Sequence, residues 1–328
     1  MKIFDILANS AAAYPENIAV RHDDRGINYR DLYRWAAGLG AYLESLGLPQ
    51  GSRAAILFEN SIDYLAAFFG VFKAGMVAVP LDTSLPPDKI NLILTDSRAD
   101  ILLCQAKYER HLPGILGDVS PIKHIITEKS LQVAPEHVIS ATFDEIFKNS
   151  MNAAVPLPGN QTLNFPNYDL EKESAASPHE LAAIFYTSGS TGSSKGVMLS
   201  HRNLISNTIA TVMYLKLETR DKIMVILPFY YIYGNSLLLT HILIGGTLVV
   251  DNRFLYPEVV LDTMQKEQVT GFSGVPSNFM ILLNNSTLAT RSWPHLRYFT
   301  QAGGAMAPEF VRRLMAAFPD KEIYIMYG

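Results

Sequence analysis

The residues best suited to chemistry form one stretch, Tyr186-Thr187-Ser188-Gly189-Ser190-Thr191-Gly192-Ser193-Ser194-Lys195-Gly196. Its glycines let successive backbone N–H groups turn inward, its hydroxyls donate further hydrogen bonds, and Lys195 adds a point charge. Apolar runs that are typical of strands flank it at 181–186 and 197–199. A flexible Gly/Ser connector is the alternative, but a connector does not normally carry a single basic residue between two strands. The stretch therefore predicts a polyphosphate-binding loop.

Other phosphate motifs do not fit this spacing. The Walker A pattern needs a glycine before its lysine and Ser or Thr after it, whereas here Gly196 follows Lys195. The pattern that fits is [YF]-T-S-G-[ST]-T-G-x-x-K-G-V followed by L-S-H-x-N, which reads Leu199-Ser200-His201-Arg202-Asn203 in this chain. In these motifs the chain closely resembles the AMP-forming acyl- and aryl-CoA synthetases, the luciferases and the adenylation domains of peptide synthetases.

The resemblance implies a first set of site residues and their ligand. It implies ATP, held by its β- and γ-phosphates with the assistance of Mg²⁺, and a catalytic role for Lys195 and Thr187. The ATP-binding residues that it implies in this stretch are Thr187, Ser188, Gly189, Ser190, Thr191, Gly192 and Lys195.

A second set lies where a predicted strand leads into a helix, in Leu227-Pro228-Phe229-Tyr230-Tyr231-Ile232-Tyr233-Gly234-Asn235-Ser236. This places aromatic rings at the carboxyl end of a strand, although a packed aromatic corner of the core would explain the same pattern. The resemblance implies an acid-binding pocket, in which the family often has histidine where this chain has Tyr231. The substrate-binding residues predicted in this segment are Tyr230, Tyr231, Tyr233 and Gly234, and Phe272 and Gly274 are further candidate walls of a pocket for an apolar or aromatic acid.

The same segment carries no acidic residue, since residues 222–250 contain neither Asp nor Glu. Amino-acid-activating members of the family have an aspartate here that pairs with the substrate ammonium. Burying an ammonium group without a counter-charge is costly. We therefore expect a small-molecule carboxylic acid, apolar or aromatic, rather than an α-amino acid.

A third set lies near the end of the chain, in Gln301-Ala302-Gly303-Gly304-Ala305 and in Tyr327-Gly328. The two adjacent glycines allow the backbone to approach a flat ligand, although an ordinary turn between a strand and a helix would look similar. The resemblance implies that this set binds adenine, with the ring of Tyr327 stacked on the base. The residues that it implies are Gly303, Gly304, Ala305, Tyr327 and Gly328.

The elements that position these sets alternate between strand and helix, which predicts an α/β fold of several layers, with mostly parallel strands and flanking helices. Asn28 and Ser61 are expected to cap helices, and Pro86-Pro87 to open another. Ligands of such sheets gather at the carboxyl ends of the strands. Strands are predicted at 54–58, 76–80, 101–104, 181–187, 223–227, 247–250, 269–273, 297–301 and 322–326. Helices of the second half are predicted at 201–215, 235–244, 256–267, 276–284 and 308–318.

The composition along the chain divides it into three parts. Residues 1–150 and 181–328 are predicted as two αβ subdomains, the second with the phosphate loop and the acid and adenine pocket. Residues 151–180, rich in proline and polar residues, are predicted as a surface linker. The family pattern continues past Tyr327-Gly328 into a ribose-binding aspartate, a hinge and a small C-terminal domain. We therefore expect a truncated N-terminal region that binds nucleotide and acid weakly on its own.

Composition limits the remaining partners. The formal net charge is −4 without a long basic run, so a nucleic-acid partner is not expected. Cys104 is the only cysteine, which excludes an internal disulfide and fits a reducing, cytoplasmic location. The longest apolar region, 237–250, is broken by Gly245-Gly246, so no transmembrane segment is expected, while peripheral membrane contact and the oligomeric state stay open. No histidine or cysteine spacing indicates a protein-ligated metal.

Together the three sets predict an ATP-dependent acid–thiol ligase. The intact enzyme is expected to form an acyl-adenylate from a carboxylic acid and ATP and to pass the acyl group to coenzyme A. Two alternatives stay open: a non-catalytic nucleotide- or acyl-binding module, and an adenylating enzyme that passes the acyl group to a carrier protein.

Overall fold

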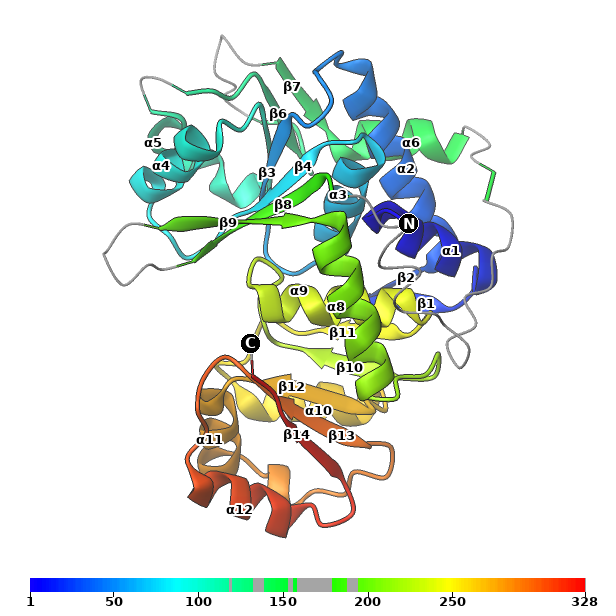
Figure 1. Ribbon diagram of the computed structural model, residues 1–328, viewed down its shortest axis with the longest axis vertical. Helices are drawn as coiled ribbons and strands as arrows, with labels where there is room; N and C mark the ends of the chain where they lie inside the picture. Colours follow the sequence, from blue (N-terminus) through cyan, green and yellow to red (C-terminus); the bar gives the residue numbers. More distant parts are fainter. Residues whose placement is uncertain (118–119, 132–138, 153–155, 158–178, 188–193, 328) are drawn as a thin grey trace.

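The computed structural model describes residues 1–117, 120–131, 139–152, 156–157, 179–187 and 194–327 (Figure 1). Its helices are α1 (Ile3–Ala13), α2 (Tyr29–Ser45), α3 (Ile62–Lys73), α4 (Pro87–Ser97), α5 (Leu112–Leu116), α6 (Phe143–Asn152), α8 (His201–Tyr214), α9 (Ile232–Leu243), α10 (Pro257–Lys266), α11 (Pro276–Asn285) and α12 (Pro308–Ala317), with 3-10 turns η1 (Ala106–His111) and η3 (Leu288–Thr290). Its strands are β1 (Ile18–His22), β2 (Arg25–Asn28), β3 (Arg53–Leu57), β4 (Val77–Pro80), β5 (Ile101–Cys104), β6 (His124–Thr127), β7 (Ile139–Thr142), β8 (Leu181–Thr187), β9 (Lys195–Ser200), β10 (Lys222–Val225), β11 (Thr247–Val250), β12 (Gly271–Gly274), β13 (Tyr298–Gln301) and β14 (Glu322–Ile325).

The described strands form two seven-stranded sheets. Sheet A has the order β14-β13-β12-β10-β11-β1-β2, and sheet B has the order β7-β6-β5-β3-β4-β8-β9. Pairing is parallel except at one edge of each sheet, where β2 runs antiparallel to β1 and β9 runs antiparallel to β8. The predicted α/β fold with mostly parallel strands and flanking helices is confirmed.

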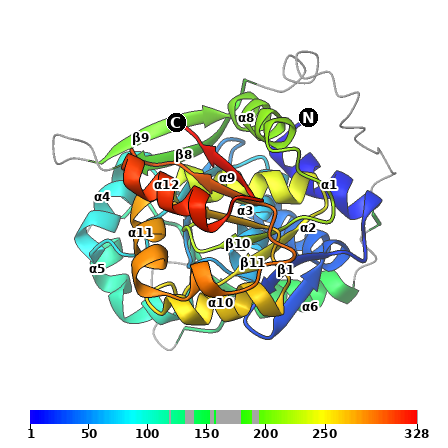
Figure 2. The same cartoon turned by 90° about the horizontal axis from the view of Figure 1, so that it is seen from below.

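Helices and sheets alternate in five layers (Figures 1 and 2). The central layer of α1, α2, α3, α8 and α9 lies between the sheets and belongs to one continuous core with their inner faces. Helices α4 and α5 pack on the outer face of sheet B, and α10, α11 and α12 pack on the outer face of sheet A. Both sheets are thus covered on both faces, which is typical of parallel sheets.

The alternation of side chains along each strand divides the core in the same way. In β10 and β11, Ile223, Val225 and Leu248 face the central core, whereas Met224 and Val249 belong to the outer core under α10 and α11. Because each strand is apolar on both faces, its sequence is a short continuous apolar run rather than an alternating one.

The local signals predicted the helix ends well. Asn28 accepts a 2.8 Å hydrogen bond from the Asp31 amide at the start of α2, and Ser61 accepts a 3.1 Å bond from the Tyr64 amide at the start of α3. Helix α9 begins at Ile232, three residues before the predicted start of 235, because the Asn235 amide already donates to the Tyr231 carbonyl. No helix in the described residues is long and apolar enough to cross a membrane.

The sheets exchange strands between the two halves of the chain. Strands β1 and β2, from the first 28 residues, extend sheet A, while β8 and β9, which follow the 151–180 segment, complete sheet B. Each half therefore contributes strands to both sheets. The division into subdomains 1–150 and 181–328 stays a prediction, and the sheets group the same strands differently.

Candidate functional site

The two ends of the predicted phosphate loop are fixed to each other. In the antiparallel pair β8–β9, Thr187 lies opposite Lys195 and Tyr186 lies opposite Gly196. The side chains of Thr187 and Lys195 are both exposed. A hydroxyl and an ammonium group are thus brought together where the two strands meet the connecting loop, and their role in binding phosphate stays a prediction. Ser188, Gly189, Ser190, Thr191 and Gly192, which the sequence assigns to the same loop, lie outside the described residues.

Tyr186 anchors this end of the hairpin. Its hydroxyl donates a 2.6 Å hydrogen bond to the Asp96 carboxylate on α4. Its ring lies against Gly196, where an added Cβ would come within 3.1 Å of the ring carbon Cζ and 2.9 Å of Ile184 Cγ2. The glycine that follows the lysine in the motif is therefore needed to let the tyrosine ring cross the strand pair.

The aromatic segment lies at the carboxyl end of β10. Tyr231 is exposed, Tyr230 is half-buried, and the phenol of Tyr233 is directed into the protein. Burial first, and the charge of Asp82 second, raise the pKa of both Tyr230 and Tyr231 above the ordinary tyrosine value. The Tyr231 hydroxyl donates to the Asp82 carboxylate at 3.2 Å, so the loop that follows β4 of sheet B contacts the segment that follows β10 of sheet A.

Gly234 leaves no space for a side chain in this segment. An added Cβ would lie 2.1 Å from the Pro228 carbonyl oxygen and 2.9 Å from the Leu227 carbonyl oxygen. The start of α9 is consequently pressed against the loop that precedes it. This contact explains the glycine of the motif as a packing requirement.

The adenine-side turn is held by a side chain that the sequence did not single out. The Gln301 amide donates to the Gly304 carbonyl at 2.8 Å and to the Ala302 carbonyl at 3.0 Å. Gly303 has a φ of +79°, a conformation that favours glycine, and an added Cβ would also lie 3.1 Å from Val275. Gly303, Gly304, Ala305 and Tyr327 are all exposed, while Gly328 lies outside the described residues.

A chain of hydroxyls connects the acid-side and adenine-side sets. The Tyr233 hydroxyl lies 2.7 Å from Thr300 Oγ1, which in turn lies 2.6 Å from Ser273 Oγ. Thr300 and Ser273 are fully buried near the carboxyl ends of β13 and β12. Sequence reasoning missed both residues, although the period of two in a strand could have separated Ser273 from its neighbour Phe272.

Phe272 lies in the core on the outer face of sheet A. Its ring is fully buried and packs edge-on against Phe279 at a centroid distance of 5.6 Å. The predicted role of Phe272 as a wall of the acid pocket stays a prediction. Gly274 lies next to the same rings, since an added Cβ would be 3.2 Å from Phe272 and 3.3 Å from Phe279.

Neighbouring elements bring the three sets to one side of the molecule. Strand β8 pairs in parallel with β4, so Thr187 and the residues after Pro80 leave sheet B at the same edge. Asp82 then reaches Tyr231, and Tyr233 reaches Thr300 on β13. In both views the carboxyl end of β14 points toward the side of the molecule where β8 and β9 lie (Figures 1 and 2).

Known proteins resemble this chain in sequence and in fold. A model described as "AMP-binding enzyme" matches residues 7–328. The chain belongs to the AMP-binding enzyme family. Within the family it is 27% identical over 326 residues to indigoidine synthase of Dickeya dadantii (strain 3937), with 98% of this chain and 20% of that protein covered. It is 26% identical over 300 residues to a long-chain-fatty-acid–CoA ligase of Bacillus subtilis (strain 168), with 86% of this chain and 52% of that protein covered.

A solved structure shares the fold. The N-terminal domain of FACL13 from Mycobacterium tuberculosis matches with a TM-score of 0.79 at 24% identity, over 100% of this chain and 75% of that one. The sequence-based resemblance to adenylate-forming enzymes is confirmed at the level of family and fold. This AMP-binding family member spans about half or less of the length of the two curated relatives named above.

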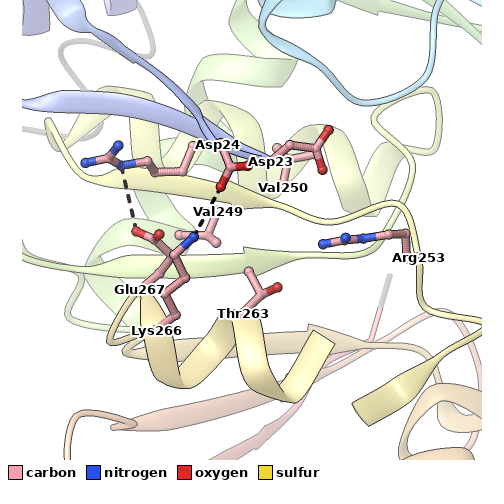
Figure 3. Close-up of a pocket in the computed structure, with 9 residues that line it drawn as sticks. Asp23, Asp24, Val249, Val250, Arg253, Thr263, Lys266 and Glu267 are labelled. Atoms are coloured by element: carbon pink, nitrogen blue, oxygen red, sulfur yellow. Dashed lines mark hydrogen bonds and ion pairs between the residues drawn. The ribbon is translucent and has the colours of Figure 1, made fainter. Parts of the chain in front are cut away.

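One cavity of this AMP-binding family member lies away from the three sets. It has a volume of about 340 Å³ and lies between the β1–β2 turn and α10 (Figure 3). Its charges are largely paired, with Arg21 3.7 Å from Glu267 and Lys266 3.4 Å from Asp24. No predicted site residue lines it. In the described parts of the chain, no three His, Cys, Asp or Glu side chains gather in a way that could hold a metal ion.

Proposed function

We propose that this chain binds ATP and a carboxylic acid in an adenylate-forming enzyme, and that the intact protein transfers the acyl group to coenzyme A. The observation that carries the proposal is the Thr187–Lys195 pair at the loop end of the β8–β9 hairpin, beside the carboxyl end of β4. An exposed ammonium and hydroxyl beside a glycine- and serine-rich stretch form a donor set that suits a polyphosphate.

The reaction places defined demands on these residues. A carboxylate oxygen of the acid attacks the α-phosphorus of ATP, the bond from that phosphorus to the bridging oxygen breaks, and pyrophosphate leaves with the electron pair. Lys195 and the donors of the loop would hold the β- and γ-phosphates in line with the attack. Mg²⁺ bound with the nucleotide would supply further neutralisation of the phosphate charge. In the second step a thiol attacks the acyl carbon and AMP leaves.

The other two sets would bind the remaining parts of the substrates. Gly303, Gly304, Ala305 and Tyr327 are proposed to contact adenine, because the turn that Gln301 holds leaves its backbone exposed. Tyr230, Tyr231, Tyr233 and Gly234 are proposed to position the acid, since the hydroxyl chain from Tyr233 to Thr300 joins their segment to the adenine side. Gly274, at the carboxyl end of β12 in sheet A, is proposed to border the acid.

The charge around the aromatic segment favours an apolar or aromatic acid. Residues 222–250 contain no carboxylate. Asp82, which sheet B brings to the segment, already accepts hydrogen bonds from the Ser84 amide and hydroxyl and from the Tyr231 hydroxyl. This carboxylate is therefore engaged rather than left open for a substrate ammonium.

Acid-dependent exchange of pyrophosphate into ATP tests the proposal in the intact protein, with a panel of fatty, aromatic and α-amino acids. We expect exchange with apolar or aromatic acids, and a loss of about 100-fold or more in Lys195→Ala because a charge that stabilises the transition state is removed. Lys89→Ala, which removes an exposed lysine of α4, is the matched control and should exchange like the wild type.

The alternatives predict other outcomes of the same assay. A non-catalytic binding module would bind ATP in calorimetry but give no exchange with any acid. An enzyme that serves a carrier protein would give exchange but no acyl-CoA when coenzyme A is added. Unchanged exchange in Lys195→Ala would contradict the assignment of the phosphate loop.

A further inference from the structure

Asn60 makes a pair of buried hydrogen bonds from one sheet to the other. It lies in the loop between β3 and α3 of sheet B, and its side chain is 4% exposed. Its amide nitrogen donates to the Leu227 carbonyl at 2.8 Å, and its amide oxygen accepts from the Phe229 backbone N–H at 2.8 Å. Both partners belong to the loop that follows β10 in sheet A. The two bonds thus enclose Pro228 and fix the backbone immediately before the aromatic segment.

The chemistry of this contact requires a carboxamide. Its nitrogen donates to a carbonyl while its oxygen, a separate atom, accepts from an N–H; a carboxylate only accepts, an aliphatic side chain does neither, and a hydroxyl would have to make both bonds through a single atom. Because the site is buried, losing one bond leaves a backbone group without a partner, which costs more than the bond itself contributes. Asn60 therefore acts as a specific bridge and not as a generic polar residue.

Asn60 is itself held on both sides. The neighbouring Ser61 caps α3, and the Glu59 N–H donates to the Gln105 side chain at 3.0 Å, so the loop is tied to sheet B. The Asn60 carbonyl accepts a 2.9 Å bond from Asn252, in the loop that follows β11. A rigid part of sheet B is consequently connected to two carboxyl-end loops of sheet A.

The loop that Asn60 binds, from Leu227 to Phe229, contacts the tyrosine segment and the start of α9. The Phe229 ring packs on Tyr64 of α3 at a centroid distance of 5.2 Å. The Tyr231 N–H donates to the Pro228 carbonyl at 3.1 Å, and Gly234 is pressed against the same carbonyl. Displacement of Pro228 would therefore move Tyr231 and the start of α9 together.

We propose that Asn60 is a positioning residue that sets the geometry of the acid-binding segment, although it lies in the other sheet. This inference rests on the proposed function, because it takes residues 230–234 as the acid-binding side of the site. If Asn60 has this role, the affinity for the acid depends on the contact that Asn60 makes between the two sheets. ATP affinity should depend on Asn60 much less, because the phosphate hairpin is tied to α4 by Tyr186 and to β4 by strand pairing.

The test compares Asn60→Ala and Asn60→Asp with a matched control in the intact protein. Asp retains the shape and can accept from Phe229, but it cannot donate to the Leu227 carbonyl. The control is Asn91→Ala, since the Asn91 side chain also donates to two main-chain carbonyls, those of Ile115 and Leu116 at 3.0 Å and 2.8 Å, but on the outer side of sheet B. The folded fraction of each variant is measured first, by urea denaturation.

Two readouts follow. In acid-dependent pyrophosphate exchange, both Asn60 variants should raise the KM for the acid about fivefold or more, as expected for loss of about 1 kcal/mol or more, with the KM for ATP changed less than about twofold. In hydrogen exchange, the Phe229 amide should exchange about tenfold faster in Asn60→Ala. Asn91→Ala should lose stability but change neither readout.

The outcomes separate this inference from the function on which it rests. A wild type without acid-dependent exchange would overturn the proposed function, and the positioning role with it. An active wild type whose acid KM is unchanged in folded Asn60→Ala would overturn the positioning role alone. An unchanged exchange rate of the Phe229 amide would contradict the bridge itself.

Discussion

The Tyr186 hydroxyl donates a 2.6 Å hydrogen bond to the Asp96 carboxylate, which ties the end of strand β8 to helix α4. Tyr186 directly precedes Thr187, the first residue of the predicted phosphate loop. Burial first, and this bond second, raise the pKa of Tyr186 above the ordinary tyrosine value, so the phenol stays a donor at neutral pH. Tyr186, the first residue of the loop motif, is therefore fixed by Asp96, which lies outside the motif on α4.

Removing this bond should weaken ATP binding and stability together. We expect Tyr186→Phe and Asp96→Ala each to lower the free energy of unfolding by about 0.5–1.5 kcal/mol, because the bond involves a charged group but lies near the surface. The double variant should lose little more than either single variant, which a double-mutant cycle in urea would measure. The KM for ATP should rise about threefold or more in Tyr186→Phe. Additive losses in the cycle would show that the two residues do not interact.

The motifs that carry the site were predictable because they are local. The stretch from Tyr186 to Gly196 and the caps Asn28 and Ser61 are patterns of neighbouring residues, and the structure places Asn28 and Ser61 at the expected helix ends and Tyr186, Thr187, Lys195 and Gly196 at the paired ends of β8 and β9. Their residue types are fixed by backbone geometry and by nearby donors. For this reason the fold class and the ends of most helices followed from the sequence.

Contacts between the sheets were not predictable. The partners of Asn60 lie 167 and 169 residues away in the chain, and no local pattern distinguishes this asparagine from one in a turn. Phe272 and Ser273 lie on opposite faces of a short strand, Gly271–Gly274, and because both faces of sheet A are covered, the sequence does not show which of the two faces the site. Strands β1 and β2 lie in the N-terminal region but pair with sheet A, and sequence order gives no signal for this exchange.

His201, the histidine of the L-S-H-x-N motif, should make the stability of the protein depend on pH. Its Nδ1 accepts a 3.2 Å hydrogen bond from the Ile3 N–H at the start of α1, so this nitrogen must be unprotonated. Burial first, and the positive charge of Lys2 second, lower the pKa of His201 to about 4, against the opposing effects of Glu180 and Asp5. The unfolded chain binds the proton near pH 6.5, the ordinary value.

The sign follows from these two values. Because the folded-state pKa is the lower one, the contribution of His201 is complete above about pH 6.5 and is lost as the pH falls toward about 4, by up to about 1.4 kcal/mol per pH unit. Urea denaturation of the wild type and His201→Asn between these pH values should show the steeper loss in the wild type. His241, whose pKa burial also lowers to about 4, is present in both proteins and cancels in the difference. Parallel curves would contradict the role of neutral His201.

The buried hydroxyl chain predicts unequal effects of substitutions at its middle and its end. Thr300 Oγ1 contacts both Tyr233 and Ser273, so Thr300→Val takes a hydrogen-bond partner from each of two buried hydroxyls, while Tyr233→Phe removes its own hydroxyl and leaves the Thr300–Ser273 contact. We expect losses in the free energy of unfolding of about 2–4 kcal/mol for Thr300→Val and about 1 kcal/mol for Tyr233→Phe. Thr208→Val is the control, because the buried Thr208 hydroxyl donates only to the Leu204 carbonyl of its own helix.

Substitutions in these hydroxyls should also change the activity, because the Tyr233–Thr300 hydrogen bond joins the acid-side helix α9 to the adenine-side strand β13. In acid-dependent pyrophosphate exchange, Tyr233→Phe should raise the KM for the acid about threefold to tenfold. This range corresponds to the loss of roughly 1 kcal/mol, the contribution of one hydrogen bond that positions the acid-side segment. Burial raises the pKa of Tyr233 to about 12, so its hydroxyl stays protonated throughout the assay range. The ratio of wild-type to Tyr233→Phe activity should therefore be constant between about pH 6 and pH 10. A ratio that changes across this range would show that the phenol titrates during catalysis, and would replace a positioning role with proton transfer.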